Sequence, residues 1–140
     1  MSEPLQFVFD VSGENFTSAG EASVTVKKNL RMLGFAPDII RRVAIAMYEG
    51  EINMVIHARG GVATVTVFPD RIEMVLDDRG PGIADIELAM REGFSTAPDN
   101  IRNLGFGAGM GLPNMKRNTD SMKIESELGK GTKITMTVNT

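Results

Sequence analysis

Hydrophobic and polar residues follow a strand-like pattern in several short segments. These segments are rich in β-branched and aromatic residues and end at turn-forming residues. Pro69-Asp70 and Gly129-Lys130-Gly131 each separate two such segments, as expected of hairpin turns. The predicted strands are residues 5–11, 61–68, 71–78, 122–128 and 132–138.

Other segments carry apolar residues at helical spacing. One predicted helix stops at Gly34, because glycine commonly follows the last turn of a helix. The next predicted helix begins at Pro37, since proline suits the first turn. A polar, irregular stretch over 94–104 is typical of a loop. The predicted helices are residues 17–33, 37–58, 83–93 and 112–118.

The order of these elements predicts the fold class. Strand pairs joined by short turns favour a mainly antiparallel sheet, and the amphipathic helices are expected to cover one of its faces. No repeat, low-complexity tract or linker divides the chain. We therefore expect a single domain over 1–140, an α/β (α+β) two-layer sandwich.

Composition narrows the classes of function. The 140 residues carry a net charge of -3 with no block of like charge, which argues against a nucleic-acid-binding or membrane-binding surface. With no cysteine and one histidine, His57, thiolate chemistry and multi-histidine metal clusters are excluded. The sequence shows no secretory signal and no apolar stretch of roughly 20 residues, so we expect a cytoplasmic protein.

The stretch LGFGAGMGLPNMKR contains four alternating glycines, Gly105, Gly107, Gly109 and Gly111. Alternating glycines before a helix could serve a dinucleotide, a nucleoside triphosphate or another strand. A dinucleotide fingerprint needs a parallel βαβ unit, whereas these glycines follow an irregular loop. The GxxxxGK[ST] phosphate loop is also missing, because Lys116 has the wrong spacing.

The second predicted helix carries Glu49, Asn53 and His57 four residues apart, on one face. They could form a solvated stripe, but the apolar residues beside them indicate that much of the helix is buried. A glutamate can accept a proton from an attacking hydroxyl or orient a water, and an asparagine oxygen suits Mg²⁺. Glu51 is a further acid that points about 200° around the helix from Glu49. Gly50 predicts either close packing or a local distortion of the helix.

The stretch Asp78-Arg79-Gly80-Pro81-Gly82 begins with a carboxylate at the end of a predicted strand and continues into a turn. These residue types are also common in ordinary turns, for conformational reasons alone. Alternatively, the Asp78 carboxylate could accept a hydrogen bond from a planar ligand's amino group, with Gly80 and Gly82 admitting the ring.

In order along the chain, four boxes resemble those of the GHKL ATPase superfamily, which includes gyrase, Hsp90, histidine kinases and MutL. The boxes are Glu49-xxx-Asn53, Asp78-x-Gly80-x-Gly82, the glycines from 105 to 111, and Gly129-x-Gly131-Thr132. The stretches NMVIHARG and GFGAGMGLPNMKR are most similar to the small anti-sigma factor and switch-type serine/threonine kinases. The resemblance covers about residues 40–138 and implies a Bergerat ATP-binding fold.

The resemblance also implies roles for individual residues. Glu49 would be the general base, Asn53 would bind Mg²⁺, and Asp78 would accept a hydrogen bond from the adenine amino group of ATP. The remaining implied nucleotide contacts are Gly80, Gly82, Gly105, Gly107, Gly109, Gly111, Leu112 and Thr132. Arg102, Lys116 and Arg117 are candidates to neutralise phosphate charge, and residues 94–104 would be the lid. The role of His57 stays open between a hydrogen bond at the helix end and a structural one.

By resemblance, the function is ATP-dependent phosphorylation of a small protein partner in sigma factor regulation. The partner would be a sigma factor or an anti-sigma factor antagonist-like protein, and a homodimer is compatible with the sequence. Two alternatives stay open: a nucleotide-gated module that binds a partner with little kinase turnover, and a detached histidine-kinase-like ATPase domain.

Overall fold

The computed structural model describes residues 4–12, 20–57, 60–80 and 111–140. Its elements, in chain order, are β1 (Leu5–Ser12), α1 (Glu21–Met32), α2 (Pro37–His57), β2 (Gly60–Val67), β3 (Arg71–Asp78), α5 (Gly111–Arg117), β4 (Ser121–Glu127) and β5 (Gly131–Asn139). Within the described part, no helix is both long and apolar enough to cross a membrane.

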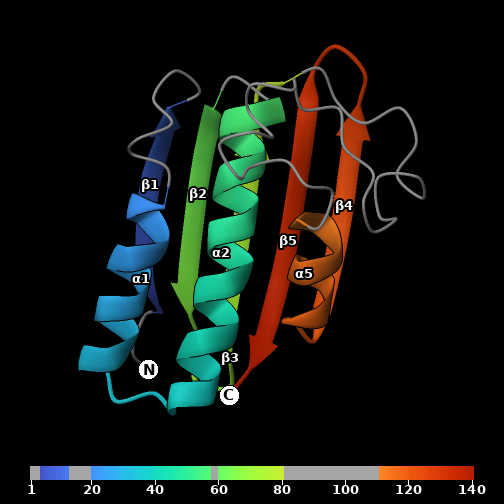
Figure 1. Ribbon diagram of the computed structural model, residues 1–140. Coiled ribbons are helices and arrows are strands. Elements are labelled where there is room, and N and C mark those ends of the chain that lie inside the picture. The colour runs from blue at the N-terminus through green and yellow to red at the C-terminus, as the bar shows by residue number, and fades with distance from the viewer. Residues whose placement is uncertain (1–3, 13–19, 58–59, 81–110) are drawn as a thin grey trace.

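The strands form a five-stranded sheet in the order β1-β2-β3-β5-β4 (Figure 1). All four pairings are antiparallel. The hairpins β2-β3 and β4-β5 join neighbours in the chain, whereas β3 and β5 pair across a long sequence separation. This non-local pairing places the end of β3 beside the start of β5, where Asp77 lies opposite Lys133.

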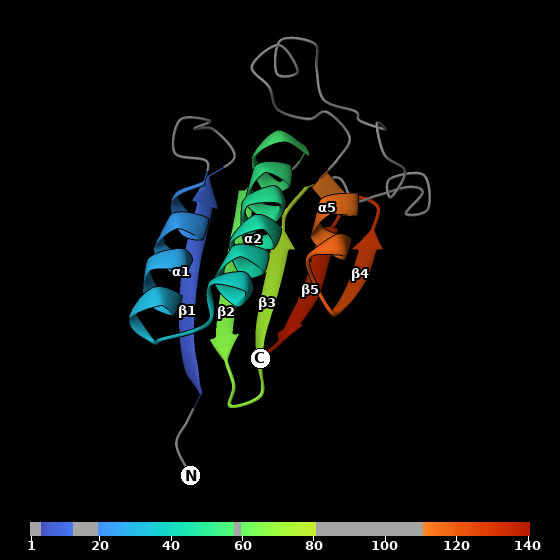
Figure 2. The same ribbon diagram turned by 60° about the horizontal axis from the view of Figure 1, so that its bottom comes forward.

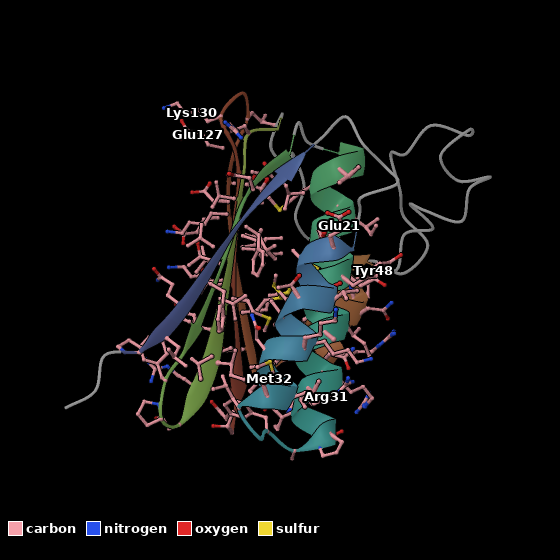
Figure 3. All side chains as sticks on the ribbon, turned by 90° about the vertical axis from the view of Figure 1, so that its left-hand side faces the viewer. Glu21, Arg31, Met32, Tyr48, Glu127 and Lys130 are labelled. Carbon is pink, nitrogen blue, oxygen red and sulfur yellow. The ribbon has the colours of Figure 1, made fainter. Side chains whose placement is uncertain are left out.

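The helices lie on one face of the sheet, which gives the molecule two layers (Figure 2). In Figure 1, α1 covers β1, α2 crosses the middle strands, and α5 lies over β5 and β4. Figure 3, seen from the side, shows side chains filling the space between the layers, with Tyr48 projecting from α2 beside the first turn of α1.

The core lies between the sheet and α2, the central helix. Alternate residues of the strands face it, as the burial pattern of β3 shows. The fully buried side chains include many methionines and aliphatic residues, with Met47 on α2 packed in the same cluster as Met74 on β3 and Met136 on β5. The opposite sheet face carries exposed polar residues such as Lys123 and Lys133, as expected for an antiparallel sheet covered on one side.

The predicted fold class is confirmed: the sheet is antiparallel, and the helices cover one face. Every predicted strand is present within one or two residues, and so are the helices beginning at Pro37 and near residue 112. The helix predicted over 17–33 is observed over Glu21–Met32. The predicted helix over 83–93 and the loop over 94–104 lie outside the described residues.

Candidate functional site

The side chains of Glu49 and Asn53 both face α5. The Asn114 side-chain nitrogen of α5 lies 3.5 Å from Glu49 Oε1. A Cβ atom added to Gly111, at the start of α5, would lie 3.1 Å from both polar atoms of the Asn53 side chain. Because α5 runs antiparallel to α2, Gly111 meets Asn53 and Asn114 meets Glu49. The predicted one-face arrangement of Glu49 and Asn53 is therefore present.

Asn53 is half-buried and keeps its side-chain oxygen available. Its amide nitrogen donates a long hydrogen bond of 3.9 Å to the Met115 sulfur. In the part of the chain that the structure describes, the Asn53 oxygen has no hydrogen-bond partner. A hard, neutral oxygen in this state suits a cation such as Mg²⁺.

Glu49 is half-buried in a setting that makes its carboxylate a better base. Burial raises the pKa of Glu49 above the ordinary value of 4.5, and the hydrogen bond from Asn114 offsets only part of this effect. A carboxylate with a raised pKa accepts a proton more readily, provided that it is still ionised at the working pH.

Glu51, two residues further along, lies on the other side of α2 and is fully engaged. Its Oε2 accepts from the backbone N–H groups of Gly20 and Ala22 at 2.8 and 3.2 Å. Its Oε1 accepts from the Ser23 N–H at 3.1 Å. Since Gly20, the N-cap of α1, has no side chain to cap the helix, the Glu51 carboxylate does so. The prediction that Glu51 points away from Asn53 is confirmed.

Asp78 ends β3 and is held by backbone groups. Its Oδ1 accepts from the N–H groups of Gly80 at 3.0 Å and Thr132 at 2.9 Å. A Cβ atom at Gly131 would lie 2.3 Å from the Asp78 carbonyl oxygen, so β5 can approach this closely only with glycine there. The second carboxylate oxygen, Oδ2, has no partner among the residues described and can accept from a ligand amino group.

Thr132 is buried at the start of β5, where its hydroxyl lies 2.9 Å from the Ser126 hydroxyl. Leu112, another predicted contact, is buried in the first turn of α5. The predicted phosphate-neutralising cations Lys116 and Arg117 lie in the last turn of α5, whereas Gly111 beside Asn53 begins that helix. The structure thus separates these cations from Asn53 along α5.

Several predicted site residues lie outside the described residues: Gly82, Gly105, Gly107, Gly109 and Arg102. The His57 side chain is also outside them, although its backbone ends α2.

Two polar residues beside the site, Ser126 and Asn114, were not predicted from sequence. Ser126 could have been found from the hairpin around residues 129–131, because Ser126 and Thr132 are cross-strand partners in its register. Asn114 and Arg117 are three residues apart, a spacing that places them on one helix face. No sequence pattern indicated that this face meets Glu49.

Residues 38–140 match the family model described as histidine kinase-, DNA gyrase B-, and HSP90-like ATPase. The chain belongs to this ATPase family, as the four boxes predicted. The match includes α2, Asp78, α5 and the β4-β5 hairpin, the elements that carry the geometry above.

The relatives include an anti-sigma factor and a serine/threonine kinase. The chain is 35% identical over 137 residues to an anti-sigma F factor of Clostridium acetobutylicum, covering 94% of this chain and 89% of that one. It is 34% identical over 106 residues to the serine/threonine-protein kinase RsbT of Bacillus subtilis, covering 73% of this chain and 74% of the kinase.

A solved structure supports the fold. The structure of the RsbU and RsbW domains of a Mycobacterium tuberculosis protein matches with a TM-score of 0.63 and 17% identity. The match covers 98% of this chain and 32% of that longer one. At this level of identity, the likeness bears on the fold alone.

Proposed function

We propose that the chain is an ATP-dependent serine/threonine kinase of the anti-sigma factor type, acting on a small protein partner. One observation carries the proposal: Glu49 and Asn53 face α5 together, and each keeps an oxygen without a partner in the described residues. The names of the relatives, an anti-sigma F factor and a serine/threonine kinase, support the class of reaction and partner.

The donor set fits a nucleotide with its metal. Asp78 presents one free carboxylate oxygen, which suits the exocyclic amino group of adenine. Asn53 presents an amide oxygen, which suits Mg²⁺. In the described part of the chain, no three His, Asp or Glu side chains form a metal cluster. A cation held by Asn53 would therefore complete its shell with phosphate oxygens and water, as Mg²⁺ commonly does.

ATP bound here would supply the γ-phosphoryl group. The attacking group is a serine or threonine hydroxyl of the partner: its oxygen bonds to the γ-phosphorus, and the bond to the β-phosphate oxygen breaks to release ADP. Glu49 accepts the hydroxyl proton. Glu51 is unsuited to this step because three backbone N–H groups of α1 occupy its carboxylate. Most of the rate enhancement in such transfers comes from positioning and charge stabilisation.

The other proposed nucleotide contacts are Gly80, Gly111, Leu112 and Thr132, with Gly82, Gly105, Gly107 and Gly109. We further propose that 1–140 is one domain and that it acts in the cytoplasm. The shared core of the described elements supports the single domain.

A second candidate is a nucleotide-gated module that holds a sigma factor with little turnover. Several relatives are anti-sigma F factors, and this favours the second candidate. Both candidates require nucleotide binding, but only the first requires phosphate transfer to a partner hydroxyl.

The first test is titration calorimetry with ATP and ADP, with and without Mg²⁺, on wild type, Asp78→Asn and Asp77→Asn. Asparagine at 78 replaces one accepting oxygen with an amide that repels the adenine amino group, so we expect affinity to fall about 10- to 100-fold. Asp77→Asn is the matched control, since Asp77 is exposed on the opposite face of β3. Equal loss in both variants, or no binding by the folded wild type, would overturn the assignment.

The second test is incubation with radiolabelled ATP and candidate antagonist-like proteins, with the modified residue mapped by mass spectrometry. Phosphoserine or phosphothreonine on a partner supports the kinase. Nucleotide binding without transfer to any partner supports the binding module, and phosphohistidine supports a detached histidine-kinase-like domain.

A further inference from the structure

Asn114 lies between the proposed base and a guanidinium group. Its side-chain nitrogen is 3.5 Å from Glu49 Oε1, and its side-chain oxygen accepts from Arg117 Nη1 at 3.2 Å. The sequence assigned no role to this residue, although it lies in the stretch GFGAGMGLPNMKR, and its side chain makes no hydrogen bond to the α5 backbone in the described contacts. Capping of α5 therefore does not explain it.

The guanidinium fixes which end of the amide faces Glu49. Arginine is only a donor, so the Asn114 end that meets Arg117 must be the oxygen. The NH₂ end then necessarily points to Glu49, and polarisation of the amide by the charged donor strengthens its donation. Arg117, Asn114 and Glu49 thus form a chain of two consecutive contacts from α5 to α2.

The backbone around Asn114 is also anchored. The Asn118 side chain donates to the Asn114 carbonyl at 2.8 Å, and Arg42 of α2 donates to the Asn118 carbonyl at 3.2 Å. Arg42 also forms an ion pair with Asp120 at 3.2 Å. These contacts tie the end of α5 to α2, which limits sliding of Asn114 along Glu49.

We propose that Asn114 is a positioning residue that holds Glu49 Oε1 and leaves Oε2 directed to the partner's hydroxyl. This proposal rests on the proposed function, because it assigns Asn114 a task in the transfer step. Glu49 Oε2 has no hydrogen-bond partner in the described residues. Without Asn114 the carboxylate can rotate, and the fraction of molecules with a correctly placed base falls.

The first arm of the test needs no activity. In the ¹⁵N-labelled protein, the side-chain NH₂ signals of Asn114 should shift on Glu49→Ala, whereas those of Asn139, exposed at the end of β5, should stay in place. Unchanged Asn114 signals would show that the contact does not form in solution and would overturn the proposal.

The second arm measures phosphate transfer by Asn114→Leu, Asn114→Gln and Asn139→Leu. Because small misplacements of a reacting group can cost up to 100-fold, we expect Asn114→Leu to lower kcat about tenfold. The KM for ATP should be unchanged, since Asn114 is not a proposed nucleotide contact. Asn114→Gln keeps the donor and should recover part of the rate. Asn139→Leu, the same substitution at an exposed asparagine at the end of β5, is the control and should retain wild-type kcat.

The outcomes separate the two proposals. A kcat for Asn114→Leu equal to wild type, or a loss shared by Asn139→Leu, would mean that Asn114 is not a positioning residue. A wild type that transfers no phosphate while the Asn114 signals still respond to Glu49→Ala would refute the kinase and the positioning role but keep the contact.

Discussion

Three consecutive residues of α2 face three different parts of the molecule. Glu49 faces α5 through Asn114, Gly50 packs under Leu76 of β3, and Glu51 binds the start of α1. The two glutamates have the same chemistry and lie two residues apart, yet Glu51 binds three backbone N–H groups whereas Glu49 has a single side-chain donor among the described residues. The backbone neighbours, rather than the residue type, decide which glutamate is available for chemistry.

The comparison also separates stability from activity. Glu51 satisfies buried N–H groups that would otherwise lack an acceptor, which stabilises the fold. Burial of Glu49 disfavours its ionised form and raises its pKa, and the hydrogen bond from Asn114 offsets only part of that cost. A half-buried carboxylate that does not stabilise the fold is typical of a functional site.

The largest expected effect is the loss of phosphate transfer in Glu49→Gln. Glutamine has the same shape but cannot take up the proton, so we expect kcat to fall about 10²- to 10⁴-fold. Affinity for ATP, measured by calorimetry, should stay close to wild type because the base is not a proposed nucleotide contact. Transfer at the wild-type rate would show that Glu49 is not the base.

The same variant tests the raised pKa through stability. The folded state disfavours the ionised form of Glu49. The contribution of Glu49 to the free energy of unfolding therefore falls as pH rises from 4.5 through its raised pKa. In urea denaturation, Glu49→Gln should therefore be at least as stable as wild type at pH 7. This advantage should vanish as the pH falls to 4.5, the ordinary pKa of a glutamate. An advantage that persists at lower pH would show that burial of the ionised Glu49 is not its cause.

The second effect is a loss of stability in Glu51→Ala. Removing the carboxylate leaves the N–H groups of Gly20, Ala22 and Ser23 without their acceptor, and we expect a cost of about 3 kcal/mol. Urea denaturation measures it, and faster hydrogen exchange at the Ser23 amide locates it on α1. Glu49→Ala is the matched control on the same helix. Equal stability of the two alanine variants would refute the contrast between the glutamates.

The architecture could be read from the sequence to a large extent. In β3, buried positions alternate with half-buried ones over residues 71–76, and proline or glycine stands at the ends of helices and in turns. The pairing of β3 with β5 was not predicted, because it joins segments far apart in the chain and depends on side-chain packing across the sheet. That pairing brings Thr132 to Asp78.

The site was only partly predictable for the same reason. Helical spacing placed Glu49 and Asn53 on one face and Glu51 on another, since it depends on α2 alone. The partners of these side chains come from other elements: Asn114 from α5 and Ser23 from α1. Spacing within a helix carries no information about which element will pack against each face.

The smallest of these effects concerns Gly50, the residue between the two glutamates. A Cβ atom there would lie 2.5 Å from Leu76 Cδ1 and 3.3 Å from Met115 Cε. Of the two explanations for this glycine, close packing is therefore confirmed. Alanine would gain up to about 1 kcal/mol of helix propensity, but overpacking typically costs about 1–3 kcal/mol. We expect Gly50→Ala to lose about 1 kcal/mol in urea denaturation.

A double-mutant cycle with Leu76→Val assigns the cause of the Gly50→Ala loss. Because Leu76 is buried, it cannot swing aside into solvent, so alanine at 50 must displace the Leu76 side chain within the core or move β3 away from α2. Valine at 76 shortens the opposing side chain, and the double variant should be more stable than the sum of the single losses. Additive losses would mean that Gly50 does not set the distance between α2 and β3. In that case the separate directions of Glu49 and Glu51 would follow from helix geometry alone, without the sheet fixing the helix in place.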